Sequence, residues 1–188
     1  DVYWDFVELP SQIMENWLGE KETLHLFAKH YETQEDIPDE LIEKIKASQA
    51  FNKGLWSLRQ LSLGFLDMAW HTTDPLNIDN VAEFEKQAME KTRLLPRVDG
   101  ANISCSFGHI FSGGYSAGYY SYKWAEALDA DAFEHFKEKG IFNKEVATSF
   151  RTNILEKGNT KPPMELYVKF RGKEPDPNAM FRRDQLLN

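Results

Sequence analysis

The chain has 188 residues, of which 41% are hydrophobic and 13% aromatic, and it carries a formal net charge of -8 at pH 7. This composition predicts a folded protein with a hydrophobic core and excludes a disordered chain. The negative charge argues against nucleic acid and against an anionic membrane as partners. The single cysteine, Cys105, excludes an internal disulfide and a cysteine-based zinc site, and we expect it to be a buried structural thiol.

Helices are the predicted elements along the whole chain. Apolar residues that recur every three, four and seven positions, N-capping residues and terminal glycines define them. The expected helices span residues 10–31 (as one or two helices), 39–53, 54–72, 80–93, 115–139, 143–157 and 162–171. Asp79 is the expected N-cap of the helix over 80–93. The sequence therefore predicts an all-α fold, organised as a single helical unit over residues 1–188.

The segment FGHIFSGGYSAGYYSY, residues 107–122, combines a histidine, two adjacent glycines and four tyrosines. The phenols that would share one face of the helix predicted there are those of Tyr115, Tyr119 and Tyr122. Tyr120 would point elsewhere. Phenol and imidazole groups can donate hydrogen bonds to a developing oxyanion, and glycines beside them let a loop close over a substrate. The same tyrosines could instead form an aromatic stripe packed in the core.

A second segment, DFVELPSQIMENW at residues 5–17, places a carboxylate, Glu8, at the start of the first helical stretch. Gln12 and Glu15 would follow one and two turns later on the same face. Pro10 disfavours a helical residue before it, so the helix could be kinked or begin only there. From the spacing alone, Glu8 could be a solvent-exposed carboxylate stabilised by the helix dipole.

Together these segments resemble the thimet oligopeptidase, oligopeptidase A and peptidyl-dipeptidase family of zinc metallopeptidases. The resemblance rests on DFVELPSQIMENW, FGHIFSGGY, YYSYKWAEAL, DADAF and FRGKEPDPNAM, which occur in the order of the family. It implies the helical C-terminal portion of a gluzincin-type peptidase with a deep substrate channel. The chain contains no H-E-x-x-H, the helical pair of zinc ligands that such an enzyme needs. We therefore expect it to be a C-terminal fragment of a larger catalytic domain.

The resemblance also implies roles for individual residues. Glu8 would be the third protein ligand of the zinc ion. Tyr122 would stabilise the oxyanion and, with His109 and Tyr115, form the catalytic set. The substrate-binding residues that the resemblance implies are His109, Gly113, Gly114, Tyr115 and Tyr119.

The function that the resemblance implies is zinc-dependent hydrolysis of short peptides, by either a peptidyl-dipeptidase or an endo-oligopeptidase. One zinc ion is expected in the full-length protein, but no tight binding to this chain alone, which would be inactive. The expected partners are short peptides and the missing N-terminal part of the same polypeptide, without which exposed apolar surface favours self-association. The alternative is a non-catalytic helical binding or scaffold module that never held metal.

The sequence contains no apolar run close to the ~20 residues that a membrane-spanning helix requires. The chain begins at Asp1, inside a patterned segment, so we expect its natural N-terminus to be missing. A cytoplasmic location is expected, with the periplasm as the alternative.

Overall fold

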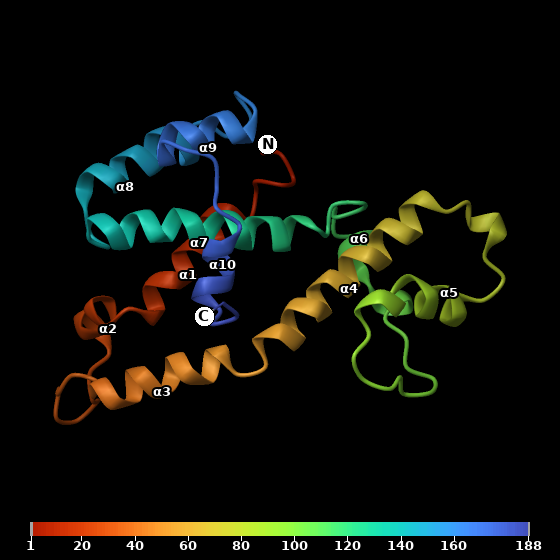
Figure 1. The fold of residues 1–188 in the computed structure, drawn as a ribbon, viewed down its shortest axis with the longest axis horizontal. Helices are drawn as coiled ribbons and strands as arrows, with labels where there is room; N and C mark the ends of the chain where they lie inside the picture. The colour runs from red at the N-terminus through yellow and green to blue at the C-terminus, as the bar shows by residue number, and fades with distance from the viewer. Residues whose placement is uncertain (1, 188) are drawn as a thin grey trace. The chain divides into compact units, whose positions relative to one another are not determined.

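A computed structural model describes residues 2–187, which form helices and connecting loops (Figure 1). The α-helices are α1 (Leu9–Asn16), α2 (Lys21–Phe27), α3 (Asp39–Ala50), α4 (Lys53–Thr72), α5 (Val81–Ala88), α6 (Gly108–Phe111), α7 (Ser121–Lys139), α8 (Lys144–Phe150), α9 (Pro163–Arg171) and α10 (Asn178–Arg183). Short 3-10 turns lie at Trp17–Gly19, Pro75–Asn77, Glu90–Thr92 and Ser104–Ser106, and a π-helix follows α8 at Arg151–Leu155. Residues 2–187 contain no β-strand, which confirms the all-α prediction. None of the helices in this range is long and apolar enough to cross a membrane.

Contacts between residues divide the chain into two compact units. Unit 1 comprises Asp1–Lys53 and Ala125–Asn188, and unit 2 comprises Gly54–Trp124. Both boundaries fall inside helices, α4 and α7, so no loop or change of composition marks them in the sequence. The expectation of a single unit over the whole chain stays a prediction.

The core of unit 1 is built around α7. In Figure 1, α1 lies on one side of α7 and the segment from α8 to α9 on the other. Buried apolar side chains of these elements form one cluster. The core residues of unit 1 are Phe6, Leu9, Ile13, Leu128, Ala132, Phe133, Phe136, Ile141, Val146, Phe150, Ile154, Leu166, Tyr167 and Phe170. Trp17 packs edge-on against Phe133 and Phe136, with ring centroids 4.7 and 4.9 Å away. Its indole N–H donates to the carbonyl oxygen of Ile141 at 3.0 Å.

A buried ion pair joins α9 to α7. Asp131 is 0% exposed, and its Oδ2 atom lies 3.1 Å from Arg171 Nε and 2.7 Å from the hydroxyl of Tyr167. Arg171 Nη2 also lies 3.3 Å from Glu138 Oε1. Burial and the hydrogen bond to the Asp131 carboxylate both raise the pKa of Tyr167. Arg171 therefore ties the motif FRG near the C-terminus to the central helix of unit 1.

A second buried carboxylate of α7, Asp129, joins α1 and α10. Its Oδ1 atom accepts a hydrogen bond from Asn16 Nδ2 at 2.9 Å and a further one from Arg183 Nη1. Asp129 is 2% exposed, and burial raises its pKa to about 6, although the charge of Arg183 opposes that shift. Burial therefore disfavours the charged form of Asp129, so the contribution of this side chain to the stability of the folded state depends on whether it is ionised.

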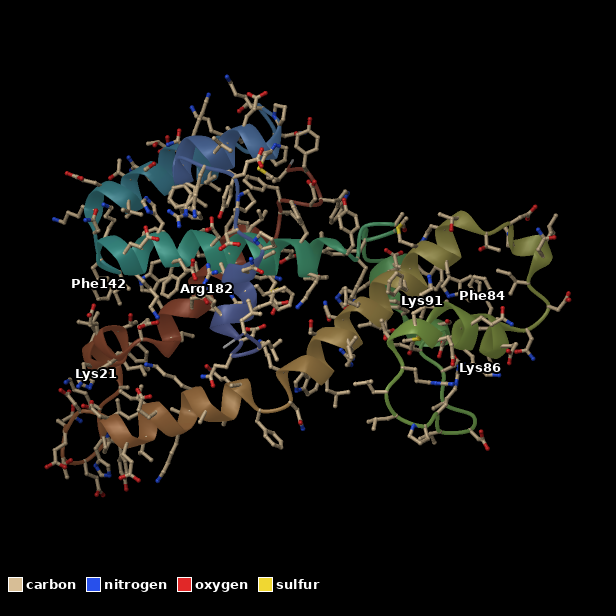
Figure 2. All side chains as sticks on the ribbon, in the orientation of Figure 1. Lys21, Phe84, Lys86, Lys91, Phe142 and Arg182 are labelled. Atoms are coloured by element: carbon tan, nitrogen blue, oxygen red, sulfur yellow. The ribbon has the colours of Figure 1, made fainter. Side chains whose placement is uncertain are left out.

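Unit 2 is organised around α4. Its core residues are Leu63, Leu66, Phe107 and Ile110, with Trp70, Ala88, Met89, Ile103 and Tyr119 packed against them. Phe84 of α5, labelled in Figure 2, lies against Trp70 with ring centroids 4.4 Å apart. The helix predicted over 80–93 ends at Ala88, and its N-cap is Asn80, because Asn80 Oδ1 accepts the N–H of Glu83 at 3.1 Å. The prediction of Asp79 as the N-cap was wrong.

Cys105 is exposed, so the prediction of a buried thiol was wrong. It lies in the 3-10 turn Ser104–Ser106, where the preceding serine is the buried residue. Glu85 of α5 accepts both the N–H of Ser104, at 2.8 Å, and its hydroxyl, at 2.7 Å. This contact draws Ser104 inward and leaves its neighbour at the surface.

Replacing Arg171 with methionine should lower the free energy of unfolding by about 3–5 kcal/mol, because it leaves the buried Asp131 carboxylate without its buried cationic partner and with only the more exposed Lys173, 3.7 Å away. Chemical denaturation measures this loss. The matched control is Arg182→Met: Arg182, labelled in Figure 2, pairs with Glu134 and Asp176 at the surface, so its loss should destabilise the protein far less. Equal losses in the two variants would contradict a special contribution from the buried pair.

The pKa of Asp129 predicts a pH-dependent stability. The folded-state pKa of about 6 lies above the ordinary value of 3.8, so the folded state binds this proton more tightly. The stabilisation from the protonated form is therefore complete below pH 3.8 and is lost as pH rises through about 6. Relative to Asp129→Asn, the wild type should lose up to about 3 kcal/mol over this range. A difference in unfolding free energy that stays constant with pH would contradict this assignment.

Candidate functional site

Glu8 lies immediately before α1 and is half-buried. Its carbonyl oxygen accepts the N–H of Gln12 at 3.0 Å, and Ser11 Oγ lies 3.0 Å from its Oε2 atom. The next residue, Leu9, is fully buried and anchors the start of α1 in the core of unit 1. Pro10 sits in the first turn, where no intrahelical N–H bond is required, so the helix begins at Leu9.

Four rings of unit 2 form one group of contacts, which we call the His109–tyrosine cluster. Its members are His109, Tyr115, Tyr119 and Tyr122. Tyr122 stacks on Tyr115 with centroids 5.1 Å apart and an interplanar angle of 19°, and its centroid also lies 5.1 Å from that of Tyr119. The His109 ring lies 6.0 Å from Tyr115, 5.9 Å from Tyr119 and 6.4 Å from Tyr122. Tyr120 is exposed and outside the cluster.

The backbone of the cluster differs from the predicted helix. We expected a helix from residue 115, whereas α7 begins at Ser121 and residues 115–120 form turns. Ala117 has φ of 54°, a left-handed conformation that ends any regular helix. Tyr115 and Tyr119 therefore reach the cluster from the turns and Tyr122 from the first turn of α7. The prediction of a shared helical face was wrong, although its three phenols do meet.

The turns are attached to α4 through Asp67. Asp67 Oδ1 accepts the N–H of Ala117 at 2.9 Å, and Oδ2 accepts that of Tyr119 at 2.9 Å. In a helix beginning at residue 115, the N–H of Tyr119 would donate to a helical carbonyl oxygen, whereas that of Ala117 would be one of the first N–H groups, which have no intrahelical acceptor. The contact with α4 satisfies both N–H groups at this point of the chain.

Glycine is favoured at positions 113 and 114 for different structural reasons. A Cβ atom at Gly113 would lie 2.9 Å from the Cα of His109 and 3.0 Å from its carbonyl oxygen, closer than a side chain can come. Gly114 has φ of 86°, which favours glycine. Across them, the N–H of Tyr115 donates to the carbonyl oxygen of His109 at 3.0 Å. The glycines thus fold the chain back onto α6 and place His109 beside the tyrosines.

The phenol of Tyr119 lies partly in the core of unit 2, where its ring meets Phe107 edge-on with centroids 5.0 Å apart. Burial raises the pKa of Tyr119, and the neighbouring phenol of Tyr122 raises it further. Arg59 and Gln60 of α4 act in the opposite direction. With the pKa above its ordinary value, the hydroxyl keeps its proton at neutral pH and can donate a hydrogen bond.

Zinc requires more ligands than this part of the protein supplies. Within residues 2–187, no three histidine, cysteine, aspartate or glutamate side chains lie close enough together to hold a metal ion. A glutamate carboxylate such as that of Glu8 suits one position of a catalytic zinc site, which takes three protein ligands. Glu8 belongs to unit 1 and the His109–tyrosine cluster to unit 2, so their convergence on one ion stays a prediction.

Asp67 is the residue at this site that the sequence analysis missed. It is the single carboxylate in the apolar run LSLGFLDMAW, residues 61–70, of a helix expected to be buried. A carboxylate in such a run must find hydrogen-bond donors when it is buried. A lone carboxylate in an apolar helix could therefore have identified Asp67 as a residue that binds another part of the chain.

Comparisons with known proteins place the chain in a family. A family-level sequence profile, that of peptidase family M3, matches residues 1–186. The chain is 44% identical over its whole length to organellar oligopeptidase A (chloroplastic/mitochondrial) of Arabidopsis thaliana and covers 24% of that protein. It is 43% identical over its whole length to oligopeptidase A of Haemophilus influenzae, covering 28% of it. Over 95% of its length it is 40% identical to dipeptidyl carboxypeptidase of Salmonella typhimurium, covering 27% of it.

The chain thus spans about a quarter of the length of the curated relatives that it matches. The match includes both the segment around Glu8 and the segment of the His109–tyrosine cluster. The predicted resemblance is confirmed at the level of the family. The chain belongs to peptidase family M3.

Proposed function

We propose that the protein containing this chain is a zinc-dependent peptidase that hydrolyses short peptides. The observation that carries the proposal is the His109–tyrosine cluster, in which three phenols and an imidazole meet on a glycine-rich turn. Membership of peptidase family M3 supports it, as do relatives named oligopeptidase A and dipeptidyl carboxypeptidase. A cytoplasmic location, with the periplasm as the alternative, stays a prediction.

In this proposal, Tyr122 stabilises the oxyanion. Its hydroxyl donates a hydrogen bond to the scissile carbonyl oxygen as negative charge develops there. Stacking on Tyr115 and the contact with Tyr119 restrict the ring, so little reorganisation is required when the charge forms. Glu8 would hold one zinc ion together with ligands from outside the chain. When bound, zinc supplies Lewis acidity and lowers the pKa of water.

The substrate-binding role falls to the glycine-rich turn and its neighbours. His109 is exposed, so its imidazole can reach a peptide group of the substrate. Gly113 and Gly114 are exposed and carry no side chain that would keep a peptide backbone away. Tyr115 and Tyr119 complete the proposed set through their half-buried phenols.

The proposal includes the rest of the polypeptide as a partner. Several large apolar side chains of unit 2 are exposed on α4, namely Leu55, Trp56, Leu61, Phe65 and Met68. The relatives are about four times as long as the chain, which leaves ample protein to cover such a surface. Without that cover, exposed apolar side chains favour self-association of the isolated chain.

Tyr122→Phe in the complete protein should keep its zinc and its KM for a short peptide but lose about a hundredfold to a thousandfold in kcat, as loss of one oxyanion donor commonly does. Glu8→Ala should instead lose the zinc itself. Metal analysis and steady-state kinetics of the two variants separate these roles.

Tyr120→Phe is the matched control, because this neighbouring phenol is exposed and outside the cluster. Its kcat should stay within a small factor of the wild-type value. Equal loss of zinc in the Tyr122 and Glu8 variants, or equal loss of kcat in the Tyr122 and Tyr120 variants, would refute the division of roles.

The 188-residue chain by itself should not hydrolyse short peptides and should not retain zinc after dialysis, since three clustered ligands are absent within residues 2–187. A quenched-fluorescent peptide assay and metal analysis of the purified chain check this. Peptide hydrolysis by the chain alone, abolished by a chelator, would overturn the proposed dependence on outside ligands.

A further inference from the structure

Asp67 is a buried charge that the proposed chemistry leaves unused. It lies in α4 and is 0% exposed. Its two carboxylate oxygens each accept one backbone N–H from the turns at residues 115–120, at 2.9 Å in both cases. His71, one turn further along α4, places Nδ1 2.8 Å from Asp67 Oδ1. The two backbone N–H groups are donors of the kind that a buried carboxylate requires.

The turns that Asp67 holds are not the conformation that the local sequence favours. The spacing of Tyr115, Tyr119 and Tyr122 predicts a continuous helix, whereas Ala117 adopts φ of 54°. A residue with a Cβ atom is unfavourable in this left-handed region, so contacts from other parts of the chain are expected to stabilise it. The Asp67 carboxylate supplies one such contact, because it accepts the N–H of Ala117 itself.

The backbone of residues 115–120 also approaches α4 closely near Asp67. A Cβ atom built on Gly64, one turn before Asp67, would lie 3.8 Å from the Cα of Tyr120. The turns therefore run directly over this face of α4. Asp67 holds the turns on the side of α4, while the N–H of Tyr115 and the hydroxyl of Ser116 donate to carbonyl oxygens of His109 and Ile110 in α6.

We propose that Asp67 is the positioning residue of the His109–tyrosine cluster. By accepting the N–H groups of Ala117 and Tyr119, it keeps residues 115–120 out of α7 and so sets where the phenols of Tyr119 and Tyr122 lie. The structural part of this inference stands without any catalytic role for the cluster. Its consequence for turnover rests on the proposed function.

Glu85 offers a matched comparison within the same unit. It is also buried, and its Oε2 accepts the N–H groups of Ile103 and Ser104 at 2.9 and 2.8 Å. It therefore fixes the chain before α6, whereas Asp67 fixes the chain after it. A carboxamide at Asp67 keeps the side-chain volume but presents an NH2 group where one backbone N–H now donates. At Glu85 a carboxamide weakens the acceptor of both N–H groups by removing its charge, and it loses the ion pair of Oε1 with Arg97.

The test is hydrogen exchange of the complete protein, followed residue by residue. In Asp67→Asn, the amides of Ala117 and Tyr119 should exchange roughly tenfold to a hundredfold faster, as expected for a lost hydrogen bond to a charged group. In Glu85→Gln, the faster amides should be those of Ile103 and Ser104. Unchanged exchange at Ala117 and Tyr119 in Asp67→Asn would overturn the proposal, whatever the catalytic role of the cluster.

Kinetics test the consequence for turnover. Asp67→Asn should lower kcat at least about tenfold while the zinc content stays at the wild-type value, because the phenols are displaced and the proposed zinc ligand, Glu8, is not. If Tyr122→Phe lowers kcat but Asp67→Asn does not, the positioning role is refuted. If Tyr122→Phe itself has no effect, the proposed function fails, and the exchange experiment still decides the structural part.

A rescue variant guards against simple misfolding of Asp67→Asn. Ala117→Gly accepts positive φ without strain and disfavours the competing helix. Adding it to Asp67→Asn should therefore restore at least part of the lost kcat and of the protection at Tyr119. A double variant that recovers neither, with helix content unchanged by circular dichroism, would contradict the proposed mechanism.

Discussion

Two backbone amides, those of Ala117 and Tyr119, donate to one buried carboxylate on α4, and the geometry of the His109–tyrosine cluster depends on this contact. It stops α7 at Ser121 and turns the preceding residues over α4. The glycines at 113 and 114 then return the chain to α6, which brings the imidazole of His109 to the phenols. A site for peptide hydrolysis on this turn would be preorganised by a residue that touches no substrate.

Within each of the two units of this acidic chain, buried carboxylates connect separate helices and turns. In unit 1, Asp129 and Asp131 of α7 face cationic and amide donors from α1, α9 and α10. In unit 2, Asp67 and Glu85 accept backbone N–H groups on the two sides of α6. Each of these four side chains is almost fully buried, and each has several donors. Removal of the donors therefore exposes a large desolvation penalty, which makes the contacts specific as well as stabilising.

Local sequence patterns predicted much of this fold, and the exceptions have a common physical reason. Apolar periodicity and capping residues located most helices, because those features act within a few residues. The break before Ser121 was missed, since it depends on Asp67, a residue fifty positions earlier. Burial of Ser104 in place of Cys105 likewise depends on a distant carboxylate, that of Glu85. The prediction that Tyr115, Tyr119 and Tyr122 lie close together assumed a helix from residue 115, whereas α7 begins at Ser121. The role of Glu8 came from the resemblance alone, because its spacing favours a solvent-exposed carboxylate.

We propose that Glu8 holds the zinc ion of the complete protein and that the His109–tyrosine cluster binds the peptide that is hydrolysed there. A crystal structure of the complete protein with zinc and a non-hydrolysable peptide analogue tests it most directly. We predict that the Glu8 carboxylate coordinates the zinc and that the Tyr122 hydroxyl donates to the oxygen of the analogue that replaces the scissile carbonyl. Zinc held without Glu8, or an analogue bound away from the four rings, would contradict the account.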